Sequence, residues 1–224
     1  MYILGIQDVN TTILCDRLVQ CIPRLLALSL LVSPATWAAP LADGWREVSF
    51  QGHTRYQPEG DHWCADARAS ASGLVREADF SLRETPWLHW QWRADVLPDW
   101  PAANEQRKGG DDFVARVYVV HKGFFPWQSR AINYVWSRQQ PVGAHWPNPF
   151  ASQAHMVVVQ GPGEAPGWHA FARNVREDFQ RYHHIDVDQV QALAIMTDTD
   201  NTGATAHACY RLPFMAAQSA SRDP

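Results

Sequence analysis

The sequence predicts an all-β fold, a two-sheet β-sandwich of jelly-roll type with one short helix at about 175–183. Three observations predict it: many short segments have strand periodicity, turn residues separate them, and a single stretch has helical periodicity. The chain of 224 residues is 46% hydrophobic and 19% charged, a globular composition that excludes a disordered or fibrous protein. Its 15 prolines and 13 glycines indicate short elements joined by turns.

The expected strands are identified by their periodicity. Residues 88–93 alternate apolar and polar side chains, as a half-buried strand does. Residues 113–120 are β-branched and aromatic on both faces, which predicts a central strand that Arg116 interrupts on one face. Further strands are expected at 45–50, 61–68, 74–80, 132–136, 156–160, 167–173, 192–196 and 205–214. Turn signals separate them at 58–60, 109–110, 147–149, 161–163 and 201–203.

The expected helix has a start signal and an apolar stripe. Asn174 is placed to cap its N-terminus, and Glu177 follows at the spacing of a capping box. Within residues 175–183, the positions i, i+4 and i+7 form one apolar face, made of Val175, Phe179 and Tyr182. This face predicts that the helix packs on a sheet.

The N-terminal segment has the pattern of a secretory signal peptide, which we place at 1–38. An apolar run at 25–32 is followed by small residues at 33–39. The alternative is a membrane anchor, but the apolar run is much shorter than the roughly 20 residues that a span needs. We therefore expect the protein to be exported.

The mature chain is expected to be a single domain that is periplasmic or secreted. It would comprise residues 39–216, followed by a loose polar tail at 217–224. No later stretch is apolar enough to suggest a stable membrane span after signal cleavage. The formal charge of −4 argues against a nucleic-acid partner, which would need a basic face.

Two cysteines remain after the signal peptide, and export makes them a candidate disulfide. Cys64 and Cys209 would be joined in an oxidising compartment. The alternative is a pair of buried free thiols. The sequence has no CxxC, HExxH or other closely spaced Cys/His set, so the spacing predicts no structural zinc site.

Charged residues beside the expected strands are candidates for a ligand site. Asp112 leads directly into the strand that carries Arg116, Arg93 ends another strand, and Arg173 precedes the helix. Arginine offers planar bidentate contacts, so these residues could line a polar groove. The alternative is that they form buried structural ion pairs.

Tryptophans are the second candidate for ligand contact, because a flat indole can stack on a sugar ring. Trp90 and Trp92 share one strand face and are expected in the core. Trp146 lies in a segment with the character of a loop, so it is the best candidate for a surface position. Trp127 lies in a similar loop.

The turn at 198–203 is a candidate calcium site. Asp198, Asp200 and Asn201 place oxygen ligands on a turn between two expected strands, which suits Ca²⁺. The alternative is a plain hairpin loop in which Asp and Asn side chains bond the backbone.

Several segments resemble an uncharacterised bacterial family, the domain of unknown function 3047. The most specific is the segment 194–203, and the similarity extends over about 45–214. The resemblance implies an exported β-rich domain and carries over no activity. By analogy at the level of the fold, the predicted β-sandwich together with the tryptophans favours a protein that binds a glycan or another envelope component. The alternatives are an enzyme on envelope polysaccharides, with Asp112, Arg116 and Asp198 near its centre, and a structural or partner-binding envelope protein.

Overall fold

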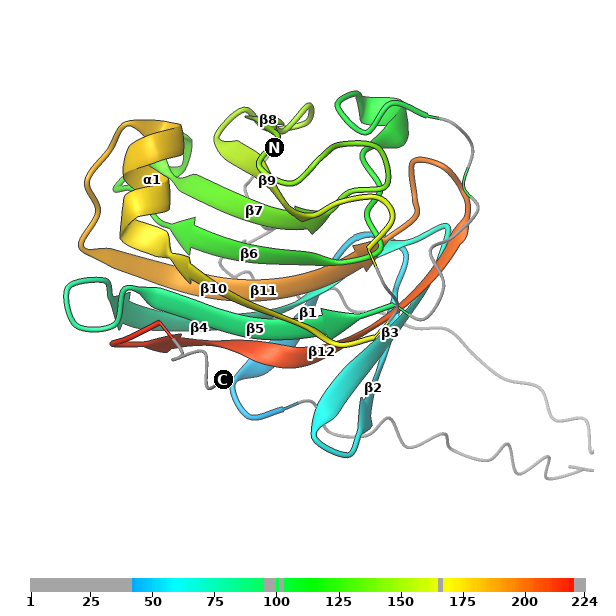
Figure 1. Ribbon diagram of the computed structural model, residues 1–224, viewed down its shortest axis with the longest axis horizontal. Helices are drawn as coiled ribbons and strands as arrows, with labels where there is room; N and C mark the ends of the chain where they lie inside the picture. The colour runs from blue at the N-terminus through cyan, green and yellow to red at the C-terminus, as the bar shows by residue number, and fades with distance from the viewer. Residues whose placement is uncertain (1–41, 95–99, 101–102, 165–166, 220–224) are drawn as a thin grey trace, which may run out of the picture.

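The protein is a sandwich of two β-sheets with one α-helix (Figure 1). The computed structural model describes residues 42–94, 100, 103–164 and 167–219. The expected signal peptide at 1–38 lies outside the described residues, as does the tail beyond residue 219. The predicted two-sheet fold and its single helix are confirmed. Within the described ranges, no helix is long and apolar enough to cross a membrane.

Seven strands form the larger sheet and five form the smaller one. The larger sheet has the order β1 (Trp45–Gln51), β4 (Ala71–Ser81), β11 (Gln189–Asp198), β6 (Arg116–His121), β7 (Arg130–Trp136), β9 (Ala154–Gln160) and β8 (His145–Pro147). The smaller sheet has the order β10 (His169–Asn174), β5 (Trp87–Arg93), β12 (Thr205–Ala216), β3 (His62–Arg68) and β2 (Arg55–Glu59). Neighbouring strands are antiparallel except β7 and β9, which run parallel.

The hydrophobic core lies between the sheets, because alternate side chains of each strand point to the same face. Trp90 and Trp92 of β5 are 2% and 0% exposed, and Trp90 stacks on Tyr134 of β7 with 5.1 Å between ring centroids. Gln91, between the two tryptophans, faces the outside of the smaller sheet, where it accepts a hydrogen bond from Arg211. The sequence-based placement of both tryptophans in the core is confirmed.

Helix α1 (Val175–His183) begins and ends as the sequence predicts. The Asn174 side chain accepts a hydrogen bond from the Glu177 backbone N–H, which caps the first turn. Val175 and Phe179 are fully buried in the core, so the helix packs against the sheets as a continuation of β10.

The short edge strands β2 and β8 are elements that the sequence pattern did not predict. Both carry a proline, at Pro58 and Pro147, which lacks the backbone N–H of a regular ladder and is tolerated at a sheet edge. The strand expected at 113–120 begins only at Arg116, because the residues before it belong to a loop.

Candidate functional site

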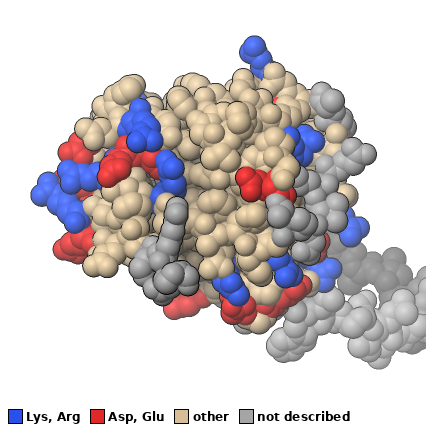
Figure 2. Space-filling model, viewed as in Figure 1, with Lys and Arg blue, Asp and Glu red and all other residues tan. Residues whose placement is uncertain are grey.

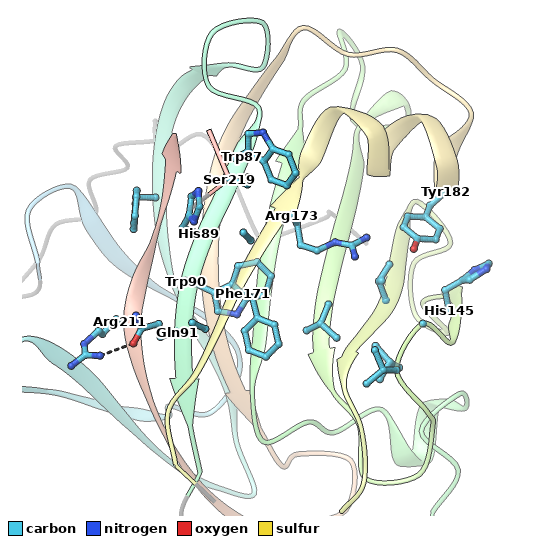
Figure 3. A pocket seen from close by; sticks show the side chains of 18 of the residues that line it. Trp87, His89, Trp90, Gln91, His145, Phe171, Arg173, Tyr182, Arg211 and Ser219 are labelled. Carbon is cyan, nitrogen blue, oxygen red and sulfur yellow. Dashed lines mark hydrogen bonds between the residues drawn. The ribbon is translucent and has the colours of Figure 1, made fainter. Parts of the chain in front are cut away.

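A groove of about 1330 Å³ wraps around the edge strand β10 of the smaller sheet. On one side it is bounded by β9 and by the segment leading into β8, both at an edge of the larger sheet, and by the last turns of α1. On the other side it continues over the outer face of β5 and β12. Figure 3 shows Phe171 and Arg173 on the side of Tyr182 and His145, with His89, Gln91 and Arg211 beyond β10.

Aromatic rings form much of the groove wall, and packing fixes their orientation. Phe171 of β10 stacks on Trp90 at 5.1 Å between centroids. Tyr182 of α1 stacks on His155 at 5.2 Å and lies 5.0 Å from the His145 ring. These rings are partly exposed, apart from Trp90, so they offer apolar surface to a ligand without prior rearrangement.

Arg173 is the best-anchored charged residue of the groove. Its Nε and Nη2 atoms donate to the two carboxylate oxygens of Asp178 at 2.8 and 2.5 Å. Tyr134 donates to the same carboxylate at 2.7 Å. Burial, the largest single influence, lowers the pKa of Arg173, but the hydrogen bonds to Asp178 together with the electrostatic influence of Tyr134, Asp178 and Tyr182 raise that pKa above its ordinary value. Arg173 is therefore a fixed cation at neutral pH.

The outward residues of β10, Ala170 and Ala172, are small and exposed, so the groove continues across the strand to its other side. Phe214 is 55% exposed there and stacks on His89 at 5.3 Å between centroids. Arg211 donates to Gln91 at 2.5 Å.

The charged side chains of the groove lining are arginines, two of which are paired with carboxylates from outside the lining: Arg173 with Asp178 and Arg211 with Asp61, at 2.9 Å. Three arginines line the groove, Arg173, Arg181 and Arg211, and no Asp or Glu of the described residues does. Figure 2 shows charged side chains gathered over α1 and along the lower rim, with a largely uncharged surface between them. Such a lining can bind an anionic or hydroxylated ligand, but it offers no carboxyl pair for acid–base hydrolysis.

A second, smaller cavity of about 260 Å³ lies on the outer face of the larger sheet. Arg116 alternates with the core residues Val117 and Val119, so it points away from the smaller sheet. Its guanidinium donates to both oxygens of Asp198, at 2.8 and 2.5 Å, and lies 3.6 Å from the Asp111 carboxylate.

Acidic groups outnumber the single arginine in this second cavity. Burial raises the pKa of Asp198, and Arg116 opposes that effect. Burial also raises the pKa values of Asp111 and Asp200. One carboxylate oxygen from each of Asp112, Asp198 and Asp200 lies within 4.8 Å of the others, and the Asp112 charge adds to the rise in the pKa values of Asp198 and Asp200.

The residues of the candidate calcium turn lie close together, but Asp112 organises them. The Asp112 carboxylate accepts hydrogen bonds from the backbone N–H groups of Asn201 and Thr202, at 3.1 and 2.7 Å. The Asn201 side chain donates to Asp112 and to Asp200, both at 3.1 Å. Asp198 is bound to Arg116. These contacts are typical of a hairpin loop whose backbone N–H groups are bound by side-chain carboxylates. One of those carboxylates belongs to Asp112, which is far from the loop in the sequence.

The expected ligand residues do not converge on one groove. Arg173 lines the large groove, Arg116 the second cavity, and Arg93 lies on the outer face of the smaller sheet, 5.3 Å from the Trp168 ring. Asp112 does not line the second cavity itself, but its carboxylate binds Asn201, which does.

The prediction of an exposed Trp146 is wrong. It is 7% exposed, because its segment forms the edge strand β8 and the indole packs with Phe113, Val135 and Met156. Trp146 therefore offers no ring face for stacking. Trp127, by contrast, is 64% exposed and stacks on Phe125 at 4.6 Å.

Sequence reasoning missed Phe171, His145 and Phe214 as groove residues. The sequence pattern assigns Tyr182 only to the apolar stripe of the helix. Phe171 lies in a strand with weak periodicity, and its place in a groove depends on β10 being a sheet edge. No local pattern in the sequence reveals that neighbour order.

Solved structures with similar folds include glycoside hydrolases and carbohydrate-binding modules. A structure from a comparison of family 12 glycoside hydrolases has a TM-score of 0.50 at 8% identity, covering 81% of this chain and 96% of that one. The xyloglucanase domain of NopAA from Sinorhizobium fredii, in complex with cellobiose, has a TM-score of 0.46 at 6% identity, covering 80% and 96%. A family 11 carbohydrate-binding module from Clostridium thermocellum has a TM-score of 0.41 at 9% identity, covering 80% and 92%.

At these identities the likeness to the family 12 enzyme concerns the fold alone. No curated protein matches the chain. Residues 43–212 match the family described as "Protein of unknown function (DUF3047)", as the sequence resemblance implied. Since the match spans most of the chain, the protein belongs to the DUF3047 family.

Proposed function

We propose that this protein is exported and binds a glycan in the groove around β10. The observation that carries the proposal is the lining, which combines partly exposed aromatic rings with three arginines and, among the described residues, no carboxylate. Aromatic faces stack on sugar rings, and guanidinium groups donate paired hydrogen bonds to the ring substituents. The leader pattern supports export, and so does the disulfide between Cys64 of β3 and Cys209 of β12, which the structure contains.

The exposed guanidinium of Arg181 and the remaining donors of Arg173 favour an acidic glycan. Arg173 is held in place by Asp178, so little conformational entropy is lost when its remaining donors bind a ligand. Arg181 is exposed on α1, at the same side of the groove. A sugar that carries carboxylate or sulfate groups would complement both side chains, and its affinity should fall as salt is added.

The test is to measure binding of uronic-acid oligosaccharides and neutral β-glucan oligosaccharides to the purified protein by calorimetry. Arg181→Ala and Phe214→Ala remove exposed groove side chains and leave the core intact, so each should weaken binding by about 1–3 kcal/mol. Trp127→Ala is the matched control, because Trp127 is an exposed aromatic residue outside the groove lining.

Three results would count against the groove. The parent protein could bind neither glycan, the two groove variants could bind like the parent, or Trp127→Ala could be the variant that loses affinity. The last result would move the binding surface to the stacked Phe125 and Trp127 rings.

A hydrolytic role is the second candidate, and the acidic second cavity favours it. Asp111 and Asp200 have raised pKa values there, and a raised pKa is what a general acid requires. The purified protein should then shorten an envelope polysaccharide, and Asp200→Asn should abolish that activity. Arg181→Ala should leave turnover of a short substrate unchanged if the second cavity alone is responsible.

A further inference from the structure

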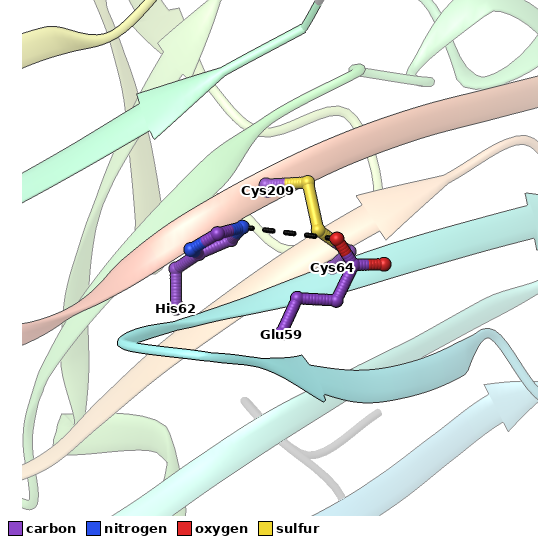
Figure 4. Close-up of side chains that lie close together, drawn as sticks. All are labelled: Glu59, His62, Cys64 and Cys209. Atoms are coloured by element: carbon purple, nitrogen blue, oxygen red, sulfur yellow. Dashed lines mark ion pairs between the residues drawn. A yellow bond between two sulfur atoms is a disulfide. The ribbon is translucent and has the colours of Figure 1, made fainter.

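The disulfide lies beside the side chains of His62 and Glu59, two residue types that can ligate metals (Figure 4). Cys64 on β3 and Cys209 on β12 are directly opposite in the antiparallel ladder. His62 lies two residues before Cys64, so both side chains point to the outer face of the smaller sheet. Glu59 on β2 is paired with His62 across the β2–β3 hairpin. One ligand atom from each of the four residues lies within 4.8 Å of all the others.

His62 is oriented as a metal ligand would be. Its Nδ1 atom is 3.0 Å from the Asp61 carboxylate, and its ring meets the Trp168 edge at 5.1 Å between centroids. Its Nε2 atom is shielded from water and has no hydrogen-bond partner among the described residues. The Glu59 carboxylate is 3.8 Å from that nitrogen. A carboxylate that fixes one imidazole nitrogen while the other is free is typical of histidines that bind zinc.

Only the sulfur atoms lack the right chemical state, because a disulfide sulfur is not a thiolate ligand. Thiol–disulfide exchange with an external dithiol would supply the two electrons and two protons that convert the disulfide into two thiols, and the dithiol would leave as its own disulfide. A zinc ion that binds the two sulfurs would then release both protons.

We propose that the reduced protein binds one zinc ion through Cys64, Cys209, His62 and Glu59. Two thiolates, one imidazole and one carboxylate are the ligand types and the number that tetrahedral zinc prefers. The site would exchange a covalent link between β3 and β12 for a metal link at the same position. Spacing along the chain does not reveal it, because Cys209 joins the other three residues only through strand pairing.

The test is a titration of the full-length protein with Co²⁺, a spectroscopic substitute for zinc, in its oxidised form and after anaerobic reduction with a phosphine. The reduced protein should bind one equivalent, with thiolate-to-cobalt absorption and the visible bands of a tetrahedral site. Zn²⁺ should displace the cobalt and raise the melting temperature of the reduced protein. The oxidised protein should show neither effect.

Variants separate this site from non-specific thiol binding. His62→Ala should weaken cobalt affinity by tenfold or more, and Cys64→Ser should remove the thiolate pair and the tetrahedral spectrum. His207→Ala is the matched control, because the His207 ring lies 3.5 Å from the Cys209 sulfur but is outside the four-residue group. The His207→Ala variant should bind cobalt with the same affinity as the parent protein.

The proposal is overturned if the reduced protein gives no tetrahedral spectrum, or if His62→Ala binds as tightly as the parent. Should reduction unfold the chain, the unfolded thiols would bind cobalt without His62. Equal affinity of His62→Ala and the parent would then also reject the site.

Discussion

His155 is the residue whose titration should be most visible in the stability of the protein. It lies on β9 between two other histidines, 3.0 Å from His145 through ring nitrogens and 5.7 Å from His183 between centroids. Burial, with smaller contributions from His183 and His145, lowers the pKa of His155 from 6.5 to about 4. The folded protein therefore resists protonation in a range where the unfolded chain accepts a proton.

The first prediction follows from that difference. Above pH 6.5 His155 is neutral in both the folded and the unfolded state, so its titration does not reduce the free energy of unfolding. Between pH 6.5 and about 4 the unfolded state binds the proton more readily, so the free energy of unfolding decreases as the pH is lowered. Urea unfolding at pH 7, 6, 5 and 4 should show this loss, and His155→Gln should show a smaller one. An equal slope in parent and variant would contradict the assignment to His155.

Arg116 illustrates how far a single residue can be understood from the sequence. An arginine that interrupts an apolar strand is predicted to be buried and paired, and Arg116 is buried against Asp198. The pattern cannot say which carboxylate pairs with it, since Asp198 comes from β11, which the sheet order places beside β6. The same limit hid the groove, whose walls come from strands that are neighbours only at the sheet edges.

At the scale of the elements, strands with a clear period were predictable and edge strands were not. β5 and β7 alternate, and the helix has a cap at Asn174, so local preference and final environment agree. β2 and β8 are short and carry prolines, and they exist because a neighbouring strand provides a hydrogen-bonding edge. For Trp146 that edge changed an expected loop residue into a buried one.

The second prediction concerns the turn between β11 and β12. Asp112 satisfies two backbone N–H groups of this turn, so Asp112→Ala should lower the free energy of unfolding by about 1–3 kcal/mol. Ca²⁺ and EDTA should leave the melting temperature unchanged if the turn is a plain hairpin. A rise with Ca²⁺ that Asp200→Asn abolishes would instead establish the calcium site.

At the scale of the whole molecule, the disulfide closes a loop of 145 residues. In the chain-entropy model a cross-link of that span destabilises the unfolded state by about 5 kcal/mol, which is an upper value. The third prediction is that the Cys64→Ala, Cys209→Ala double variant loses up to this amount in urea unfolding, measured in EDTA so that no metal contributes. A decrease in the free energy of unfolding of less than about 1 kcal/mol would contradict the chain-entropy model for this cross-link.

The order of the strands has a consequence for how the chain can fold. β11 is a central strand of the larger sheet and β12 is the middle strand of the smaller one, yet they are the last two strands along the described part of the chain. Until these C-terminal segments emerge from the ribosome, β4 and β6 have no strand to join them, and neither do β5 and β3. We therefore expect both sheets to close late in folding, after the β12 segment is available, and a chain that stays open until then would suit the proposed export in unfolded form.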